Sequence, residues 1–432
     1  MKCLLLVLAV AVPVLAACQA AQSPPVLTEE LVVTIALNNN PTLAQAQAEA
    51  GMARARVAGA RSEHELQVSA NGLAALSNMG NAILVPGVMP QAILGSQDRT
   101  SLDVNVMAMV PLDTGGRIKN SIRASELDSA AFEALLEGAR VEVAYMARMR
   151  FAEWQAAVAS AKVADDALPA QAEQTRVSEQ MVDAGKAPRF DLLRNQAALA
   201  SRQQDVAAAE AEVAVAKAKV AQVLGTAVET FSEPANERRE ALPADLLAAA
   251  LATRPDLAAA QHSTERATAL VASSKASFKP QVYGVGMADL LAPSVGNDNI
   301  GLTVGVVAGI PLVDGGRRRA EVDEAQQGVL RAQAAVSTLE LQVKAEVVAA
   351  QARLGAAQQN IGTAGAQVTA ADEGYKVAQV RYAAGKSAVV ELLDSLQALT
   401  EAQQGLVKAR ANLSGAYAEM YRALGVAVPG RK

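Results

Sequence analysis

Aromatic residues are scarce in this sequence. Phe, Trp and Tyr make up 3% of its 432 residues, although 51% of the chain is hydrophobic. A large globular core normally takes much of its buried area from aromatic rings, so their scarcity argues against such a core. Ala, Gln, Glu, Val and Leu dominate instead, which is typical of long helices packed closely on one another.

Long hydrophobic runs are also absent beyond residue 20. A transmembrane helix needs about 18 or more consecutive apolar residues, so the mature chain is expected to contain none. If the chain crosses a membrane, it must use β-strands closed into a barrel. Lipid offers no hydrogen-bond partners, so every backbone N–H and C=O group in the membrane must pair within the protein. A net charge of −5, with 19% charged residues, argues against a nucleic-acid-binding protein and against a disordered one.

Cysteine occurs only twice, both times near the N-terminus. A basic residue and an apolar run over residues 4–15 are typical of a secretory signal peptide, which predicts removal of residues 1–17. The sequence Leu-Ala-Ala-Cys ending at Cys18 resembles the lipobox of bacterial lipoproteins, which implies acylation of Cys18. The glutamine that follows it favours an outer-membrane lipid anchor. An ordinary signal peptide cleaved near Ala17 is the alternative, and in either case no disulfide or thiolate metal site is expected.

An internal repeat organises the rest of the chain. From Pro111 onward the separation between matching residues is constant, since 311 − 111, 385 − 185 and 425 − 225 all equal 200. The mature chain is therefore expected to divide into a first repeat, 18–235, and a second repeat, 236–432. The matching segments are residues 36–43 and 250–257, 110–117 and 310–317, 184–186 and 384–386, and 224–225 and 424–425.

Each repeat is expected to contain a helix, two strands, a long helix, a turn and a return helix. Apolar residues alternate with polar or small ones over 102–110 and again over 300–310, which is the length and period of a tilted membrane strand. This parity places Asp103 and Asn105 on one face, toward water, and Val104 and Val106 on the other, toward lipid. A soluble sheet with one wet face is the alternative that the strands alone leave open.

Two very long helices are predicted after the Gly-Gly-Arg sequences, from Arg117 to about Val182 and from Arg317 to about Tyr382. At 1.5 Å per residue each would extend about 100 Å, which exceeds the diameter of a globular domain. Pro169 is expected to interrupt the first of them and to kink it. Shorter helices stacked end to end beside each long one would complete a tube wall, with strands at one end and turns at the other.

The whole mature chain resembles the TolC-like outer-membrane efflux family. The resemblance rests on the repeat, on the Gly-Gly-Arg junctions, and on Val-Arg-Tyr-Ala-Ala-Gly-Lys at 380–386 followed by Glu-Leu-Leu-Asp at 391–394. It implies a mainly α-helical fold with a small membrane β-barrel: a homotrimer whose long antiparallel coiled-coil helices form an α-barrel above a 12-stranded β-barrel. Counting supports the trimer, because four strands per chain cannot close a barrel and three copies supply twelve.

The resemblance also implies a function and partners. The lipobox is similar to that of the lipoprotein branch, whose members work with a periplasmic adaptor protein and an inner-membrane pump. The expected function is a passive exit duct for small molecules such as drugs, metals or other toxic solutes. The alternative is a structural periplasmic coiled-coil lipoprotein without a pore. No catalytic constellation is present, so neither an enzyme nor a cofactor is expected.

The turn between each long helix and its return helix is the region expected to function. Asp191 and Glu391 occupy equivalent repeat positions, since 391 − 191 = 200, and Asp394 lies one helical turn after Glu391 on the same face. In the family that the chain resembles, the corresponding acids line a constricted periplasmic entrance, and a tyrosine matching Tyr382 helps to hold it shut. Solvated acids at a helix start, where the helix dipole favours them, are the alternative.

One position departs from the family pattern. The basic linking residue of the family, two positions after the glycine, is here Ser387. Lys386 or Arg194 would then have to supply the closing contact of the gate.

Histidine and methionine could in principle bind metal, but a structural role is favoured for both. His64 and His262 have no partners related by the repeat, whereas a metal site needs several converging ligands. The methionines at 79, 89, 107 and 109 could handle a soft metal, but they are better explained as fillers of irregular apolar contacts.

Overall fold

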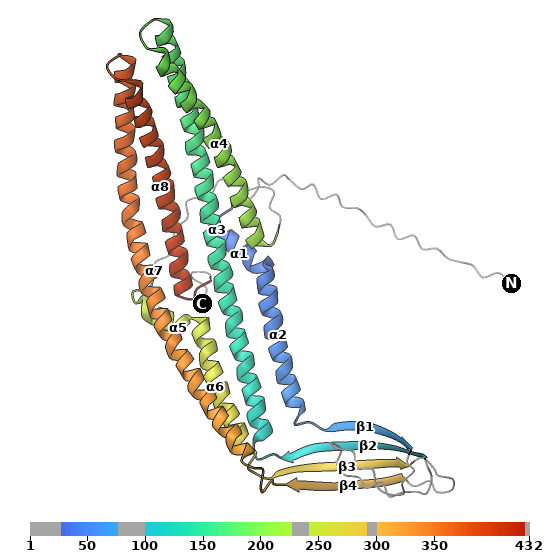
Figure 1. Cartoon of the computed structure of the whole chain (residues 1–432). Helices are drawn as coiled ribbons and strands as arrows, with labels where there is room; N and C mark the ends of the chain where they lie inside the picture. Colours follow the sequence, from blue (N-terminus) through green and yellow to red (C-terminus); the bar gives the residue numbers. More distant parts are fainter. Residues whose placement is uncertain (1–26, 77–99, 227–241, 292–299, 428–432) are drawn as a thin grey trace, which may run out of the picture.

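The computed structural model describes residues 27–76, 100–226, 242–291 and 300–427 (Figure 1). Cys18, Met79 and Met89 therefore lie outside the described residues. The elements are α1 (Glu29–Asn39), α2 (Pro41–Ser62), β1 (Gln67–Leu76), β2 (Thr100–Asp113), α3 (Arg117–Asp183), α4 (Arg189–Leu224), α5 (Leu246–Thr253), α6 (Pro255–Ala276), β3 (Gln281–Leu291), β4 (Ile300–Gly309), α7 (Arg317–Ala383) and α8 (Val389–Ala423).

Two long helices run the length of the molecule, as predicted (Figure 1). Both α3 and α7 contain 67 residues, which corresponds to about 100 Å of helix. α4 and α2 lie beside α3, while α8 and α6 lie beside α7, and the strands cross the far end (Figure 1). Within the described ranges, none of the helices combines the length and apolar character required for a membrane span. The mainly helical fold with a small antiparallel sheet is thus confirmed.

The expected interruption at Pro169 is wrong, because α3 continues through this residue. A proline inside a helix frees the carbonyl four residues earlier, which here belongs to Asp165. Both Pro169 and Asp165 are exposed, so water can satisfy that carbonyl.

Each long helix begins at a pair of glycines with positive φ. Gly115 and Gly116 have φ of 61° and 92°, and Gly315 and Gly316 have φ of 65° and 91°. An aspartate supports each turn: Asp113 accepts from the Gly115 N–H at 2.8 Å, and Asp314 from the Gly316 N–H at 3.1 Å. Residues with a Cβ rarely adopt this backbone conformation, which explains the Gly-Gly pair at every bend from strand to helix.

The hydrophobic core lies midway along the molecule, where the short helices meet end to end. In the first repeat, Val32 and Val33 of α1 pack with Phe151 and Trp154 of α3 and with Leu224 at the end of α4. In the second repeat, α5 packs in the same way against α7 and the end of α8, through residues that include Ala250, Val343, Val347, Met420 and Leu424. The short helices are therefore held to the long ones at this level.

A glycine ends each return helix where it meets the helix junction of the same repeat. A Cβ at Gly225 would lie 2.5 Å from the Asn39 carbonyl oxygen, and one at Gly425 would lie 2.9 Å from the Cα of Arg254. The Asn40 side-chain amide donates to the Val223 carbonyl at 2.7 Å, closing the junction of the first repeat. The repeated Leu-Gly pair is thus explained by close backbone approach.

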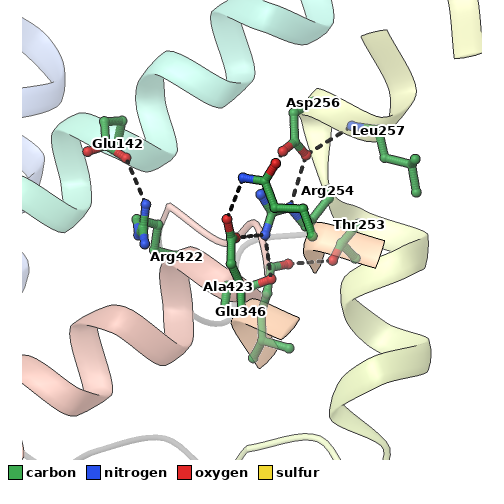
Figure 2. Close-up of polar contacts among 10 residues, drawn as sticks. Glu142, Thr253, Arg254, Asp256, Leu257, Glu346, Arg422 and Ala423 are labelled. Carbon is green, nitrogen blue, oxygen red and sulfur yellow. Dashed lines mark hydrogen bonds and ion pairs between the residues drawn. The ribbon is translucent and has the colours of Figure 1, made fainter. Parts of the chain in front are cut away.

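Arg254 replaces Asn40 in the second repeat and forms a charged cluster (Figure 2). The side chain of Arg254 is only 11% exposed, and its guanidinium binds the carboxylates of Asp256 and Glu346, which come from α6 and α7. Burial disfavours the charged forms, but the hydrogen bonds within the cluster outweigh it, raising the pKa of Arg254 and lowering the pKa of Asp256 and Glu346. The cluster therefore joins α6 to α7 near the end of α8.

Arg254→Met should destabilise the protein by about 1–3 kcal/mol, because it leaves two partly buried carboxylates unpaired. The pKa of each carboxyl is lower in the folded than in the unfolded protein. The contribution of the cluster to the free energy of unfolding is therefore complete above the ordinary pKa values, 3.8 for Asp256 and 4.5 for Glu346, and is lost as the pH falls below them. Thermal unfolding followed by circular dichroism should show the difference from wild type shrinking between about pH 6 and about pH 3.

Arg353→Met is the matched control, since Arg353 is 67% exposed in its pair with Glu419 and should contribute little. Equal destabilisation by the two substitutions, or a difference that does not change with pH, would contradict the assigned role of the Arg254 cluster.

Candidate functional site

The four strands form an antiparallel sheet in the order β1-β2-β3-β4. Val106 of β2 lies opposite Ala70 of β1 and Ala288 of β3, and Ala288 lies opposite Leu302 of β4. Because side chains alternate between faces, the positions on this side whose side chains are described are apolar or glycine as far as the register shift at Pro111–Asp113. Leu302, Val304 and Val306 on the same face are 77%, 79% and 65% exposed. The sheet thus presents a broad apolar surface.

The opposite face of the sheet is mixed and more polar. Asn105 lies opposite Asn71, whose amide donates to the Asn105 side-chain oxygen at 3.3 Å. The next row joins Met107 to Ser69 and Met287. The register therefore separates Asn105 from Val104 and Val106, as their alternation predicted, while the side chain of Asp103 lies outside what the structure describes.

The other end of the molecule consists of two tight turns, one in each repeat. In the second turn the Gly385 N–H donates to the Tyr382 carbonyl at 2.9 Å, and the Lys386 N–H donates to the Arg381 carbonyl at 2.9 Å. This is a Schellman helix end, which requires the positive φ of 66° found at Gly385. Gly185 makes the equivalent turn with φ of 68°. The repeated Ala-Gly-Lys sequence is the signature of these turns.

Tyr382 joins the two helical hairpins of one chain at the tip. It is 4% exposed and packs with Val389 and Leu392 of its own hairpin, against Val177 and Met181 of α3. Its hydroxyl lies 3.4 Å from the hydroxyl of Ser178, which is completely buried. Gln174 makes a second link, donating to the Tyr375 hydroxyl at 3.4 Å. Apolar packing and two hydrogen bonds therefore hold the end of α3 against α7 and α8.

The predicted acids lie at the start of the return helices. Glu391, in the first turn of α8, forms an ion pair with Arg381 at 3.0 Å, with both side chains about half exposed. Asp394 is exposed one turn later, and Asp191 is half-buried in the first turn of α4. The structure thus brings Glu391 close to Tyr382 through the neighbouring Arg381, while Asp191 belongs to the other hairpin.

The basic residues suggested for closing the gate make no such contact within one chain. Lys386 and Arg194 are exposed, and neither has an ion-pair partner among the described residues. The hydroxyl oxygen of Ser387, the position that departs from the family pattern, is buried without a hydrogen-bond partner in that same part of the chain.

Sequence reasoning missed Arg381, Ser178, Gln174 and Tyr375. Arg381 could have been found, because it directly precedes Tyr382 and the turn brings it back to the first turn of α8. The polar residues of α3 could not be found from the repeat, since subtracting 200 from Tyr375 and Tyr382 gives Thr175 and Val182 rather than Gln174 and Ser178. These contacts connect non-equivalent positions of the two repeats.

The histidines are not brought together. His64 follows the end of α2 near the sheet, whereas His262 lies in the second turn of α6, far from the sheet end of that helix. No group of three or more His, Cys, Asp or Glu residues in the described ranges could hold a metal ion. Met107 and Met109 lie on the more polar face of the sheet, beside Met287.

Comparison with known proteins gives a consistent result. The profile of the family described as outer membrane efflux protein matches residues 32–226 and 246–426. The pyoverdine export outer membrane protein OpmQ of Pseudomonas putida is 27% identical over 416 residues, which cover 91% of this chain and 85% of that protein.

Solved structures share the same fold. The outer-membrane channel OprN superposes with a TM-score of 0.78 at 25% identity, covering 92% of this chain and 89% of that one. CusC, whose structures are described in terms of folding and transmembrane channel formation, gives a TM-score of 0.80 at 20% identity and covers 92% of both chains.

Proposed function

The chain belongs to the outer membrane efflux protein family and is a subunit of an outer-membrane efflux channel, and from this premise we propose that three copies form the passive exit duct of a tripartite export system. The observation that carries the proposal is the sorting of the sheet into one apolar and one more polar face. Such a sheet matches the wall of a barrel with lipid outside and water inside.

The edges of the sheet support a trimer. Among the described residues, β1 pairs with β2 alone and β4 with β3 alone, so in a single chain both outer strands carry backbone groups without a strand partner there. In lipid these groups must be satisfied, and pairing β4 of one copy with β1 of the next continues the antiparallel order and closes twelve strands.

An apolar stripe on α7 supports the same assembly. Leu341, Val348 and Val377 are 66%, 64% and 57% exposed in the single chain. Their spacings of 7 and 29 residues keep them within about 20° of one another around the helix. A neighbouring copy would cover this stripe and complete the helical tube.

The proposed partners are a periplasmic adaptor protein and an inner-membrane pump that supplies the energy. The relative OpmQ is named for pyoverdine export, and we propose a small-molecule cargo for this channel as well. We further propose that Asp191, Tyr382, Lys386, Glu391 and Asp394 form the periplasmic gate, and that the repeats divide between residues 235 and 236.

Ion conductance tests the proposed function. The purified protein, reconstituted in a planar lipid bilayer, should conduct ions in discrete steps, and crosslinking should yield a trimer. A periplasmic spacer would give neither result. The duct would be contradicted if a trimeric, membrane-inserted protein failed to conduct ions even after the tip contacts described below had been removed.

We propose that Cys18 carries the lipid anchor and that the anchor is auxiliary to the barrel. Cys18→Ser, exported by a cleavable signal peptide, should lose lipid labelling but still form trimers, because the strands rather than the lipid span the membrane. Metabolic labelling with a fatty acid and electrophoresis of unheated samples measure the two effects. An unmodified N-terminal cysteine on the wild-type protein, found by mass spectrometry, would refute acylation.

A further inference from the structure

The apolar face of the sheet continues past the strands to a band of basic residues. Leu112, near the end of β2, shares the side of Val110, and Leu312 follows β4 by three residues; they are 56% and 85% exposed, while the neighbouring Val313 is 92% exposed. The Gly-Gly turn follows, and then Arg-Ile-Lys at 117–119 in the first repeat and Arg-Arg-Arg at 317–319 in the second. The same succession of apolar and basic side chains thus occurs twice per chain.

Four exposed cations at this level have no acidic partner in the described part of the chain. We call Lys119, Lys275, Lys279 and Arg319 the junction collar. They come from the start of α3, the end of α6, the link from α6 to β3, and the start of α7. The stem of Lys279 lies against the first Gly-Gly turn, because a Cβ at Gly115 would be 2.5 Å from its Cβ.

Three acids beside the collar already have partners, whereas Asp323 and Glu324, one helical turn beyond Arg319 on α7, are exposed. Asp314 binds Arg318, which is 7% exposed, and this contact helps to lower the pKa of Asp314 to about 2. Glu321 pairs with Arg317, and Asp113 accepts the Gly115 N–H. The end of β1 differs, since glutamates accompany Arg61 and His64 there. The collar therefore covers the ends of β2, β3 and β4, in a chain whose overall charge is −5.

We propose that the junction collar binds the phosphate groups of anionic phospholipids in the membrane leaflet that faces the helices. The inference rests on the proposed function, because it needs the sheet to be embedded in lipid. Basic side chains next to an apolar membrane band are attracted to anionic headgroups, and Leu312 and Val313 are placed to enter the adjoining acyl layer. Three copies would carry twelve collar cations around the barrel.

Native mass spectrometry of the detergent-solubilised trimer tests this proposal. The wild-type trimer should retain phosphatidylglycerol about tenfold more than phosphatidylcholine, since each basic residue near the surface adds to the attraction. The preference should weaken as ionic strength rises. Soluble glycerol phosphate at equal concentration should not displace the lipid, because it lacks the acyl chains that contact the apolar row.

The collar variant, Lys119→Gln with Lys275→Gln, Lys279→Gln and Arg319→Gln, should retain the two lipids equally. The matched control, Arg331→Gln with Lys344→Gln, Lys408→Gln and Arg410→Gln, removes the same charge from exposed positions on α7 and α8 and should keep the preference. Should the fourfold collar variant fail to assemble, Lys275→Gln with Lys279→Gln should lose part of the preference.

Equal retention of the two lipids by the wild-type trimer, or equal losses in the collar and control variants, would overturn the proposal. Bilayer conductance separates this failure from failure of the duct. A conducting trimer without lipid preference refutes the collar alone, whereas a protein that never inserts refutes the duct itself.

Discussion

Val106→Lys should abolish assembly of the channel in the outer membrane, whereas Met107→Lys should leave most of it intact. Val106 lies in the row of Ala70, Ala288 and Leu302, on the face proposed to contact lipid. A lysine on the lipid face near the membrane midplane costs about 2–4 kcal/mol, and a trimer would contain three. On the opposite face the lysine of Met107→Lys would meet water. Outer-membrane fractions analysed by electrophoresis without heating would measure the trimer.

A second pair of substitutions controls for the residue replaced. Val104→Lys should behave like Val106→Lys, and Asn105→Lys like Met107→Lys, because the parity of the strand rather than the identity of the side chain decides the outcome. If all four variants assembled equally well, the sheet would be a soluble one, and the periplasmic spacer would become the better explanation of the chain.

The sheet faces could be predicted from sequence because they depend on local alternation. Asn105, Val104 and Val106 separate by parity alone, and no knowledge of the neighbouring strands is needed. The ends of the long helices could also be predicted from the sequence. The backbone has positive φ at 115–116, 185, 315–316 and 385, and this conformation favours glycine. Local steric requirements restrict the residue types at these positions, so the sequence predicts them.

Contacts between distant segments could not be predicted in this way. The junctions at Asn40 and Arg254 occupy equivalent places, yet one uses a neutral amide and the other a charged cluster with Glu346. Either set of contacts is compatible with the close approach of the backbone at the junction, so the repeat does not predict which one is used. The continuous helix at Pro169 likewise involves the surroundings of Asp165 and Pro169, which are exposed and which only the packing of α3 determines.

The tip was predicted in part. The turn and the acids at the start of the return helices were recognised, but the partner of Tyr382 was not, because Ser178 lies 204 residues earlier in the sequence. The ion pair between Glu391 and Arg381 also changes the expected charge at the tip. One of the three carboxylates of each chain already has a cationic partner, so the acids cannot be treated as a ring of free charges.

Tyr382→Ala should raise the conductance of the trimer several-fold. The ring is buried between the two hairpins of one chain, and its removal takes away packing of about 3–5 kcal/mol together with the contact to Ser178. The end of α3 would then separate from α7 and α8, and the periplasmic entrance would widen. Single-channel recording in planar bilayers measures the change, and trimer yield shows whether the protein still assembles.

Smaller substitutions separate closure from general loss of packing. Tyr382→Phe and Ser178→Ala each remove the same hydroxyl contact, which is worth about 1 kcal/mol, so the two should raise the conductance slightly and to the same extent, alone or combined. Tyr417 lies farther along α8, and Tyr417→Phe, which loses a contact with Gln358 of α7, should leave the conductance unchanged. Glu391→Ala with Asp394→Ala should instead weaken cation selectivity, because charge rather than packing is removed. A closed channel with wild-type conductance in Tyr382→Ala would show that the constriction lies elsewhere.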